Sequence, residues 1–208
     1  LEFRRVLFRS YGRKASGTAR LEGRPIELSD VPGAIAAGLA YVTEDRKELG
    51  LILAEDIRKN ITLTNLREVA HSGVVDDMAE LKVANAYRSR MRIRCASVYQ
   101  EAGQLSGGNQ QKIVLSKWLF TDPKVLFLDE PTRGIDVGAK YEIYCIINEL
   151  ADAGRGVVVI SSEMPELLGI CDRICVMNEG AFVAEFPAAE ATQEKIMRAI
   201  MRNREARA

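Results

Sequence analysis

Two uninterrupted apolar runs of strand length stand out in the second half of the chain. They are Val125–Leu128, within KVLFLDE, and Val157–Ile160, within GVVVISS. Continuous runs of this kind are typical of strands that a parallel sheet buries on both faces. Between the runs, apolar residues recur at helical spacing as far as Gly154. They are Ile143, Ile146, Ile147 and Leu150. Strand, helix and strand in this order predict a right-handed crossover unit, so we expect an α/β fold with a mostly parallel sheet.

Shorter elements precede this unit. The stretch TARLEGRPIEL alternates around Gly23 and predicts a short β-hairpin. In SDVPGAIAAG, either Ser29 or Asp30 can cap a short helix that has Pro32 in its first turn and Gly38 at its end. LAYVTED then predicts a brief strand. The α/β pattern therefore extends toward the N-terminus.

The middle of the chain is more polar and predicts helices. Residues 56–69 and 76–92 have helical character, and the second stretch opens with Asp76 and Asp77 near its positive end. We therefore expect residues 50–103 to form a helical subdomain inserted into the part that contains the sheet.

The remaining region, residues 104–208, holds the crossover unit and the C-terminal elements. NQQKIVLSKWLF predicts a helix, MPELLGICD a short helix, RICVMNEGAFVAEF a hairpin and TQEKIMRAIMR a terminal helix. By contrast, the first ten residues, LEFRRVLFRS, are basic and apolar without a clear period. We expect residues 1–10 to be a non-native or unrelated leader, and residues 11–208 to be the folded region.

Composition and charge exclude several functional classes. The 29 basic residues balance 29 acidic ones, so no net charge attracts nucleic acid or anionic lipid. The apolar runs are far shorter than the roughly 18 residues needed to span a bilayer, so any membrane role must be peripheral. His71 is the only histidine, which leaves no histidine-based zinc site and no Ser-His-Asp triad to propose.

KVLFLDE ends in two adjacent carboxylates, Asp129 and Glu130. A parallel strand brings such residues to the carboxyl edge of the sheet, where open α/β sheets bind ligands. In nucleotide hydrolases an acid in this place helps to hold Mg²⁺, and a neighbouring group orients the attacking water. The alternative is a strand that simply ends in solvated acids, and this motif alone does not decide between the two.

The octamer LSGGNQQK, residues 105–112, favours a ligand site over a strand that ends in solvated acids. Ser106, Gly107 and Gly108 precede a helix, so exposed N–H groups and the positive helix end can face an anion. The glycines allow the backbone to come close to a ligand, and Ser106 adds a hydroxyl donor. The alternative is an ordinary glycine loop, but LDEPTRGID follows downstream and favours a phosphate site.

LSGGNQQK, KVLFLDEP and TRGID, in this order and spacing, resemble the signature, Walker B motif and D-loop of an ATP-binding-cassette (ABC) ATPase. YVTEDRKELGL and VVVISSEMPELLGICDRICVM resemble the second, C-terminal cassette of the tandem ATPase subunits in ribose-, galactose- and xylose-type sugar importers. The resemblance implies a P-loop NTPase-type sheet with an inserted helical subdomain. It also implies ATP and Mg²⁺ as cofactors.

The resemblance also implies roles for single residues. Asp129 would act on Mg²⁺ through water, and Glu130 would be the catalytic residue that polarises the attacking water. Gly134 to Asp136 would lie across a dimer interface. Glu44 occupies the glutamine-loop position and Ser162 the switch-histidine position, where histidine normally holds the γ-phosphate. The residues placed at ATP are Ser106, Gly107, Gly108, Gln110, Glu44, Asp136 and Ser162.

A phosphate loop of the form G-x-x-x-x-G-K-[ST] does not occur in the 208 residues. GRKASGT, Gly12 to Thr18, has two glycines at the right spacing, but Thr18 stands where lysine is required. The segment after it predicts a strand, whereas a phosphate loop must lead into a helix. We therefore expect the chain to begin after Walker A and to donate its signature to the ATP of another cassette.

The partners implied by the resemblance are a second cassette, transmembrane permease subunits and, indirectly, a sugar-binding protein, at the cytoplasmic face of the membrane. Because catalysis normally needs the histidine that Ser162 replaces, a non-catalytic regulatory cassette is an alternative. A soluble ABC protein of translation or DNA repair is another. The neutral charge argues against a nucleic-acid partner.

Overall fold

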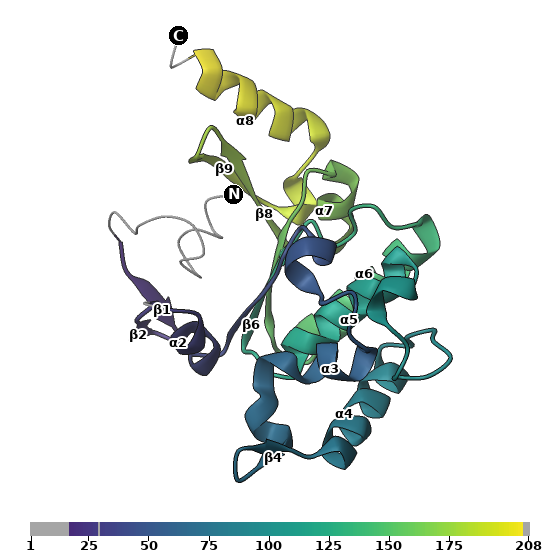
Figure 1. The fold of residues 1–208 in the computed structure, drawn as a ribbon. Helices are drawn as coiled ribbons and strands as arrows, with labels where there is room; N and C mark the ends of the chain where they lie inside the picture. Colours follow the sequence, from purple (N-terminus) through teal and green to yellow (C-terminus); the bar gives the residue numbers. More distant parts are fainter. Residues whose placement is uncertain (1–16, 29, 206–208) are drawn as a thin grey trace. The chain divides into compact units, whose positions relative to one another are not determined.

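A computed structural model of the chain describes residues 17–28 and 30–205 (Figure 1). The described residues fall into two compact units, one ending at Ile160 and the other beginning at Ser161. The predicted leader, residues 1–10, lies outside the described residues, as does most of the Gly12–Thr18 segment. The segment after Thr18 is a strand, as predicted.

The first unit contains a parallel sheet with strand order β3-β6-β7. In register, Leu39 lies beside Val125, and Val125 beside Gly156. Helix α6 connects β6 to β7, which confirms the predicted crossover unit and the α/β fold class. The elements are β3 (Leu39–Val42), β6 (Val125–Asp129), α6 (Val137–Asp152) and β7 (Gly156–Ile160).

The prediction that GVVVISS is a buried strand is wrong. Strand β7 is only half-buried, and Val158 is 36% exposed. The reason is its place in the sheet, because among the described residues β7 pairs with β6 alone. An apolar run shows that a strand can be buried, but it does not show that both faces are covered.

Small elements pack on one face of the sheet. The hairpin β1–β2 and helix α2 contribute Leu21, Ile26 and Ala34 to a cluster with Tyr41 and Phe127. Asp30 caps α2 by accepting a hydrogen bond from Gly33 N, which decides between the two predicted caps. The elements are β1 (Ala19–Leu21), β2 (Arg24–Ile26) and α2 (Val31–Ala36).

Helix α5 (Gly107–Leu119) follows the LSGG motif, packs on β3 and contacts α6. Most of its residues are buried. The four helically spaced positions of α6 are also buried, as predicted: Ile143, Ile146, Ile147 and Leu150. The signature helix therefore has fixed neighbours on both the sheet and α6.

The helical subdomain lies in the same unit, with α3 and α4 side by side (Figure 1). The prediction of one helix over residues 56–69 is wrong, because the backbone is non-helical at Asn65. The elements are α3 (Ile57–Thr62), η2 (Leu63–Val69), β4 (Ala70–His71), β5 (Val74–Val75), α4 (Asp77–Arg90) and η3 (Ala102–Gln104).

The second unit contains an antiparallel hairpin, β8–β9, and helices on either side of it in sequence, as predicted. Its core holds Ile174, Val176 and Ile196. None of the helices in the described part of the chain is both long and apolar enough to cross a membrane. The elements are α7 (Met164–Ile170), β8 (Arg173–Asn178), β9 (Ala181–Pro187), η4 (Ala188–Glu190) and α8 (Gln193–Glu205).

Candidate functional site

The signature serine lies at the exposed start of α5. Ser106 is the N-cap residue, but its side chain makes no capping bond to the helix backbone. Its hydroxyl oxygen instead accepts a hydrogen bond of 3.0 Å from the side-chain nitrogen of Asn109. The first N–H groups of a helix have no partner within it, and the positive end of the helix dipole lies there. This end of α5 therefore has the chemistry of an anion site.

The two signature glycines lie close to neighbouring segments of the same chain. A Cβ atom at Gly108 would lie 2.5 Å from the Cβ of Ala139 in α6. A Cβ atom at Gly107 would lie 2.8 Å from Nη2 of Arg46 and 3.2 Å from the carbonyl oxygen of Gly134. The sequence suggested close approach to a ligand, and the structure adds close approach to two neighbouring segments.

Gln110 lies on the inner side of the signature helix. It is 4% exposed, and its Nε2 donates to the carbonyl oxygen of Ala102 at 3.2 Å. The side chain thus joins α5 to the short helix η3 before it. A role for Gln110 at ATP stays a prediction.

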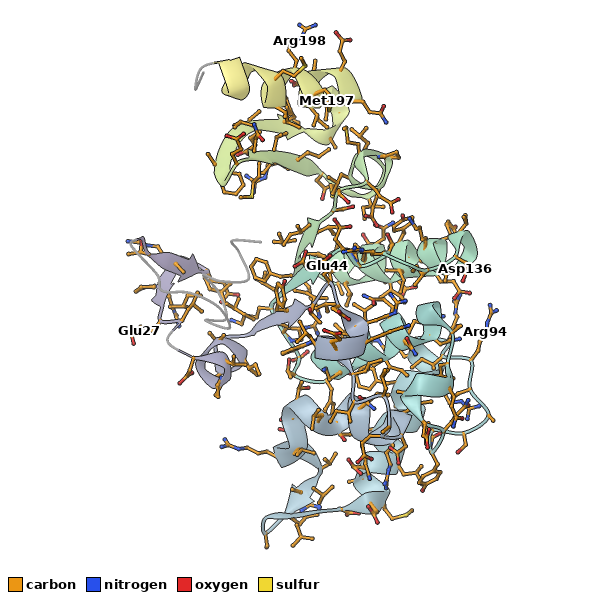
Figure 2. All side chains as sticks on the ribbon, turned by 45° about the horizontal axis from the view of Figure 1, so that its top comes forward. Glu27, Glu44, Arg94, Asp136, Met197 and Arg198 are labelled. Atoms are coloured by element: carbon orange, nitrogen blue, oxygen red, sulfur yellow. The ribbon has the colours of Figure 1, made fainter. Side chains whose placement is uncertain are left out.

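A polar pocket lies between the beginnings of α5 and α6. Asp136 caps α6, since its carboxylate accepts a hydrogen bond of 2.9 Å from Ala139 N. Figure 2 shows Asp136 and Arg94 on the same side of the first unit. The pocket is lined by Arg94, Ser106, Gly108, Asn109, Asp136, Gly138, Ala139 and Glu142. Three of the predicted ATP-site residues, Ser106, Gly108 and Asp136, are therefore brought together.

Two cations share one carboxylate at the edge of this pocket. Lys112 is buried, and its Nζ lies 2.6 Å from Oε2 of Glu142. Arg94 lies 3.0 Å from the other oxygen of Glu142. The hydrogen bond from Lys112, together with the charges of Lys112 and Arg94, lowers the pKa of Glu142. The network joins α5, α6 and the segment before the signature.

The paired acids lie at the carboxyl end of β6, as predicted. Asp129 is 7% exposed, and its carboxylate accepts a hydrogen bond from the hydroxyl of Tyr41. Glu130 follows with a φ of 47° and donates its N–H to the carbonyl oxygen of Ile160 at 2.8 Å. A positive φ is uncommon for a residue with a side chain, and such positions concentrate at functional sites.

A test of fit for Mg²⁺ rests on Asp129. Among the described residues, no group of three or more candidate ligands could hold a metal by itself. Nucleotide sites do not need such a group, because Mg²⁺ is usually held by one or two carboxylates together with water and phosphate oxygens. A nearly buried carboxylate at the end of a parallel strand fits this arrangement.

Glu44 and Arg46 form contacts that the sequence did not predict. Glu44 forms an ion pair with Arg133, in the turn that follows the paired acids. Arg46 begins the π-helical turn η1 (Arg46–Gly50) and donates to the carbonyl oxygens of Arg133 and Gly134. Arg46 directly follows Glu44 and Asp45 in the sequence. Nothing in the sequence pattern indicates that its partners lie in the turn after the paired acids.

Ser162 belongs to the second unit and lies between β7 and α7. The other candidate residues belong to the first unit. Its assignment to the switch position stays a prediction.

Comparison with known proteins assigns the chain to a family. It is 58% identical over 93% of its length to the L-arabinose transport ATP-binding protein AraG of Geobacillus stearothermophilus. It is 54% identical over 92% of its length to the xylose import ATP-binding protein XylG of Geobacillus kaustophilus. The chain spans only 38% of the length of either relative.

A solved structure has the same fold. A nucleotide-free ATP-binding cassette from an ABC transporter superposes with a TM-score of 0.73 at 17% identity, covering 96% of this chain and 79% of that one. Residues 5–133, which include the signature and the paired acids, match the ABC transporter family. The chain therefore belongs to the ABC transporter family.

Proposed function

We propose that this chain is part of the ATP-binding subunit of a sugar importer, and that it presents its signature to ATP held by a partner cassette. The names of the two relatives, which concern L-arabinose transport and xylose import, support a sugar as the cargo. The observation that carries the proposal is the start of α5, where Ser106 is exposed beside backbone N–H groups of the first turn. A terminal phosphate is an anion that such a helix end can bind.

The paired acids would serve a nucleotide on this cassette's own side. Asp129 would hold Mg²⁺ through water, and Glu130 would orient the attacking water. Bound Mg²⁺ neutralises charge that develops on the phosphate oxygens. The bond from Tyr41 fixes the Asp129 carboxylate, so this ligand would be in place before a nucleotide arrives.

A second candidate function is a non-catalytic cassette that regulates its partner. Ser162 favours it, because a serine at the switch position cannot replace the ring nitrogens of histidine. The two functions share the signature and differ at this cassette's own acids. Glu130→Gln in the complete subunit separates them, because it lowers ATP turnover only if these acids are catalytic.

The partners follow from the same proposal. They are a second cassette, which holds the ATP that the signature contacts, and a transmembrane permease, which this cassette would serve at the cytoplasmic face of the membrane. A sugar-binding protein would act indirectly through the permease. The equal numbers of acidic and basic residues argue against a nucleic acid as a further partner.

The test uses Ser106→Ala in the complete subunit assembled with its permease. Ser106 is exposed and makes no capping bond to the helix backbone, so the change removes a phosphate donor at little cost to folding. We expect steady-state ATP turnover and sugar uptake to fall by about a hundredfold, a typical loss for one donor to a developing charge.

The matched control is Ser89→Ala, an exposed serine of α4, which should leave both activities unchanged. Wild-type turnover and uptake in Ser106→Ala would rule out the signature role. Gly108→Asp is a weaker test, because any side chain at Gly108 first meets Ala139 in the same chain.

A further inference from the structure

The segment between β3 and α3 is fastened at its beginning to the turn that follows the paired acids. The Glu44 carboxylate pairs with Arg133. The guanidinium of Arg46 donates to the carbonyl oxygen of Arg133 at 2.7 Å and to that of Gly134 at 3.1 Å. We call these four residues, Glu44, Arg46, Arg133 and Gly134, the clamp. Its two halves come from positions far apart in the sequence.

The clamp reaches the signature as well. Nη2 of Arg46 lies 2.8 Å from the position that a Cβ at Gly107 would occupy, and the carbonyl oxygen of Gly134 lies 3.2 Å from it. Gly134 has a φ of 66°, a conformation that glycine adopts without strain. Three segments therefore meet at Arg46: its own turn, the Arg133–Gly134 turn and the start of α5.

The other end of the segment is fastened to the helices of the same unit. Nζ of Lys117, a residue only 6% exposed, donates to the carbonyl oxygen of Gly50. The buried Asn60 side chain accepts from Ile52 N at 2.8 Å and donates to Ile52 O at 3.0 Å. A segment held at both ends transmits displacement better than a loop held at one.

Arginine suits this position better than lysine would. A guanidinium presents several donors in a planar fork, so it can bond two carbonyl oxygens at once. Nε of Arg46 is buried and has no hydrogen-bond partner among the described residues, which costs free energy. The contacts of Arg46 to the turn are therefore made by its two terminal nitrogens.

We propose that Arg46 is a positioning residue that sets the Arg133–Gly134 turn against signature Gly107, so that the segment from Glu44 to Ile52 and the signature move together when ATP binds. This inference rests on the proposed function of the signature. Arg46 acts through the turn and does not itself touch ATP.

The test compares Arg46→Met and Arg46→Lys with Lys47→Met in the complete subunit assembled with its permease. Lys47 is the exposed neighbour of Arg46 and serves as the control. Two quantities are measured: steady-state ATP kinetics, and amide hydrogen exchange of peptides that cover residues 131–136 and 104–110.

We expect Arg46→Met to lower kcat by about tenfold while KM for ATP changes by less than about twofold, because the signature is misplaced rather than lost. Exchange should rise in the two named peptides and stay at the wild-type rate in a peptide from α4, since only local bonds are broken. Arg46→Lys should recover part of kcat, and Lys47→Met all of it. Wild-type kcat and exchange in Arg46→Met would overturn the inference.

If Arg46→Met does not fold, the ion pair of the clamp provides a second test. Arg133→Met removes the partner of Glu44 and leaves Glu44 itself in place. It should lower kcat and raise exchange in the peptide of residues 131–136, because the clamp then loses one of its bonds. Wild-type kcat and exchange in Arg133→Met would overturn the inference. A wild-type subunit that neither hydrolyses ATP nor imports sugar would instead refute the proposed function, so the two failures are distinguishable.

Discussion

At the residue scale, Gly108 illustrates how one residue type can satisfy two demands. The LSGG motif suggests glycine for approach to phosphate, and the structure adds the contact with Ala139, 2.5 Å from where a Cβ would lie. Interiors are packed so closely that one extra methyl group is felt. Loss of activity in a Gly108 variant therefore reports on helix packing as well as on ATP.

Gly108→Ala should lower the free energy of unfolding by about 1–3 kcal/mol, the usual cost of overpacking. Gly108→Ala combined with Ala139→Gly should restore most of the loss apart from the helix-propensity cost of glycine, about 1 kcal/mol. Urea denaturation measures both. Gly169→Ala is the control, because a Cβ there has open space around it. Equal losses in the single and double variants would show that Ala139 is not the obstacle.

Lys117 is a second residue whose environment matters more than its type. Burial lowers the pKa of its ammonium from 10.5 to about 8. Between these two pH values the unfolded chain binds more protons than the folded chain, so stability rises as pH increases from about 8 to about 10.5. The full effect is on the order of 3–4 kcal/mol, since one pKa unit corresponds to about 1.4 kcal/mol.

We therefore expect Lys117 to raise the Tm of the wild-type protein as the pH increases from about 8 to about 10.5. Lys117→Met should lack this contribution to the pH dependence of Tm. Scanning calorimetry at several pH values measures it. Lys82→Met, at an exposed position of α4, should keep the wild-type pH dependence. The same dependence in Lys117→Met would contradict the assignment.

At the element scale, tertiary contacts override local preference between α3 and α4. The hydroxyl of Thr64 donates to Lys117 O at 2.6 Å, and the amide of Asn65 donates to Phe120 O at 3.2 Å. These bonds to the end of α5 replace the helical continuation that the sequence of residues 56–69 predicts. Side-chain competition for backbone groups is a general reason why such residues interrupt helices.

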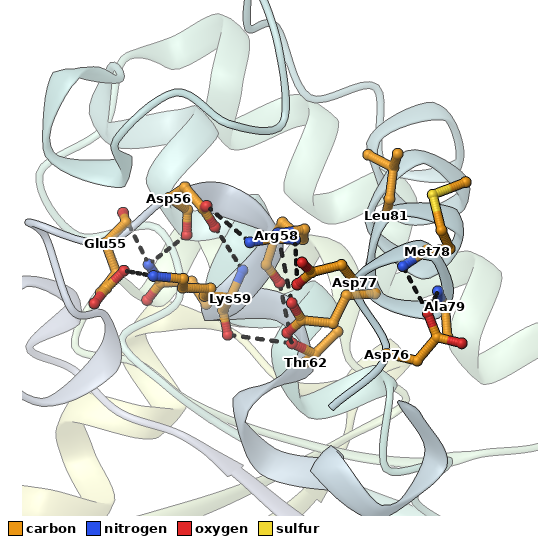
Figure 3. A network of polar contacts seen from close by, with 12 residues as sticks. Glu55, Asp56, Arg58, Lys59, Thr62, Asp76, Asp77, Met78, Ala79 and Leu81 are labelled. Carbon is orange, nitrogen blue, oxygen red and sulfur yellow. Dashed lines mark hydrogen bonds and ion pairs between the residues drawn. The ribbon is translucent and has the colours of Figure 1, made fainter. Parts of the chain in front are cut away.

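One buried arginine, Arg58, joins α3 to α4 (Figure 3). Arg58 contacts Asp77 at 3.1 Å and Glu80 at 3.5 Å, and its guanidinium lies 5.2 Å from the ring centre of Tyr99. Glu80 is 4% exposed and also accepts a hydrogen bond from Thr62. The carboxylate of Glu80 is thus buried with a cationic partner from the facing helix.

Arg58→Met should lower the free energy of unfolding by about 3 kcal/mol, because it leaves the buried carboxylate of Glu80 without its cation. Chemical denaturation measures the change. Lys59→Met is the control: Lys59 pairs with Glu55 at the surface, and exposed pairs contribute little. The double variant Arg58→Met/Glu80→Leu should be more stable than Arg58→Met, because it removes the unpaired carboxylate. Equal stability of the two variants would show that the unpaired charge does not cause the loss.

At the scale of the whole molecule, the candidate signature and the paired acids lie in the unit that ends at Ile160, whereas Ser162 lies in the other. The sequence contains no G-x-x-x-x-G-K-[ST] loop to hold phosphates. In the proposed signature role, a second cassette that carries such a loop holds the ATP.

We expect the purified chain alone to hydrolyse ATP at least roughly a hundredfold more slowly than the complete subunit, because catalysis needs preorganised phosphate donors. Phosphate release at saturating MgATP measures this. The control is the chain mixed with a cassette that carries an intact phosphate loop, which should bind ATP more tightly than that cassette does alone. Turnover by the chain alone that matches the complete subunit would exclude the half-site role.

The sequence by itself determined the elements whose signals are local, and the motifs. The apolar run of β6, the helical spacing of α6 and the short helix that begins beside Pro32 depend only on neighbouring residues, and the structure confirms them. The family likewise follows from short motifs in a fixed order, and the match of residues 5–133 confirms it.

Only the tertiary structure decided the remainder. The exposure of β7 depends on which strands lie beside it. The clamp joins Arg46 to the carbonyl oxygens of residues that follow it by 87 and 88 positions in the sequence. Backbone carbonyl groups are the same at every position, so no residue type marks the two that Arg46 binds. Periodicity and propensity describe a residue in relation to its neighbours in sequence, whereas these contacts depend on where the folded chain returns.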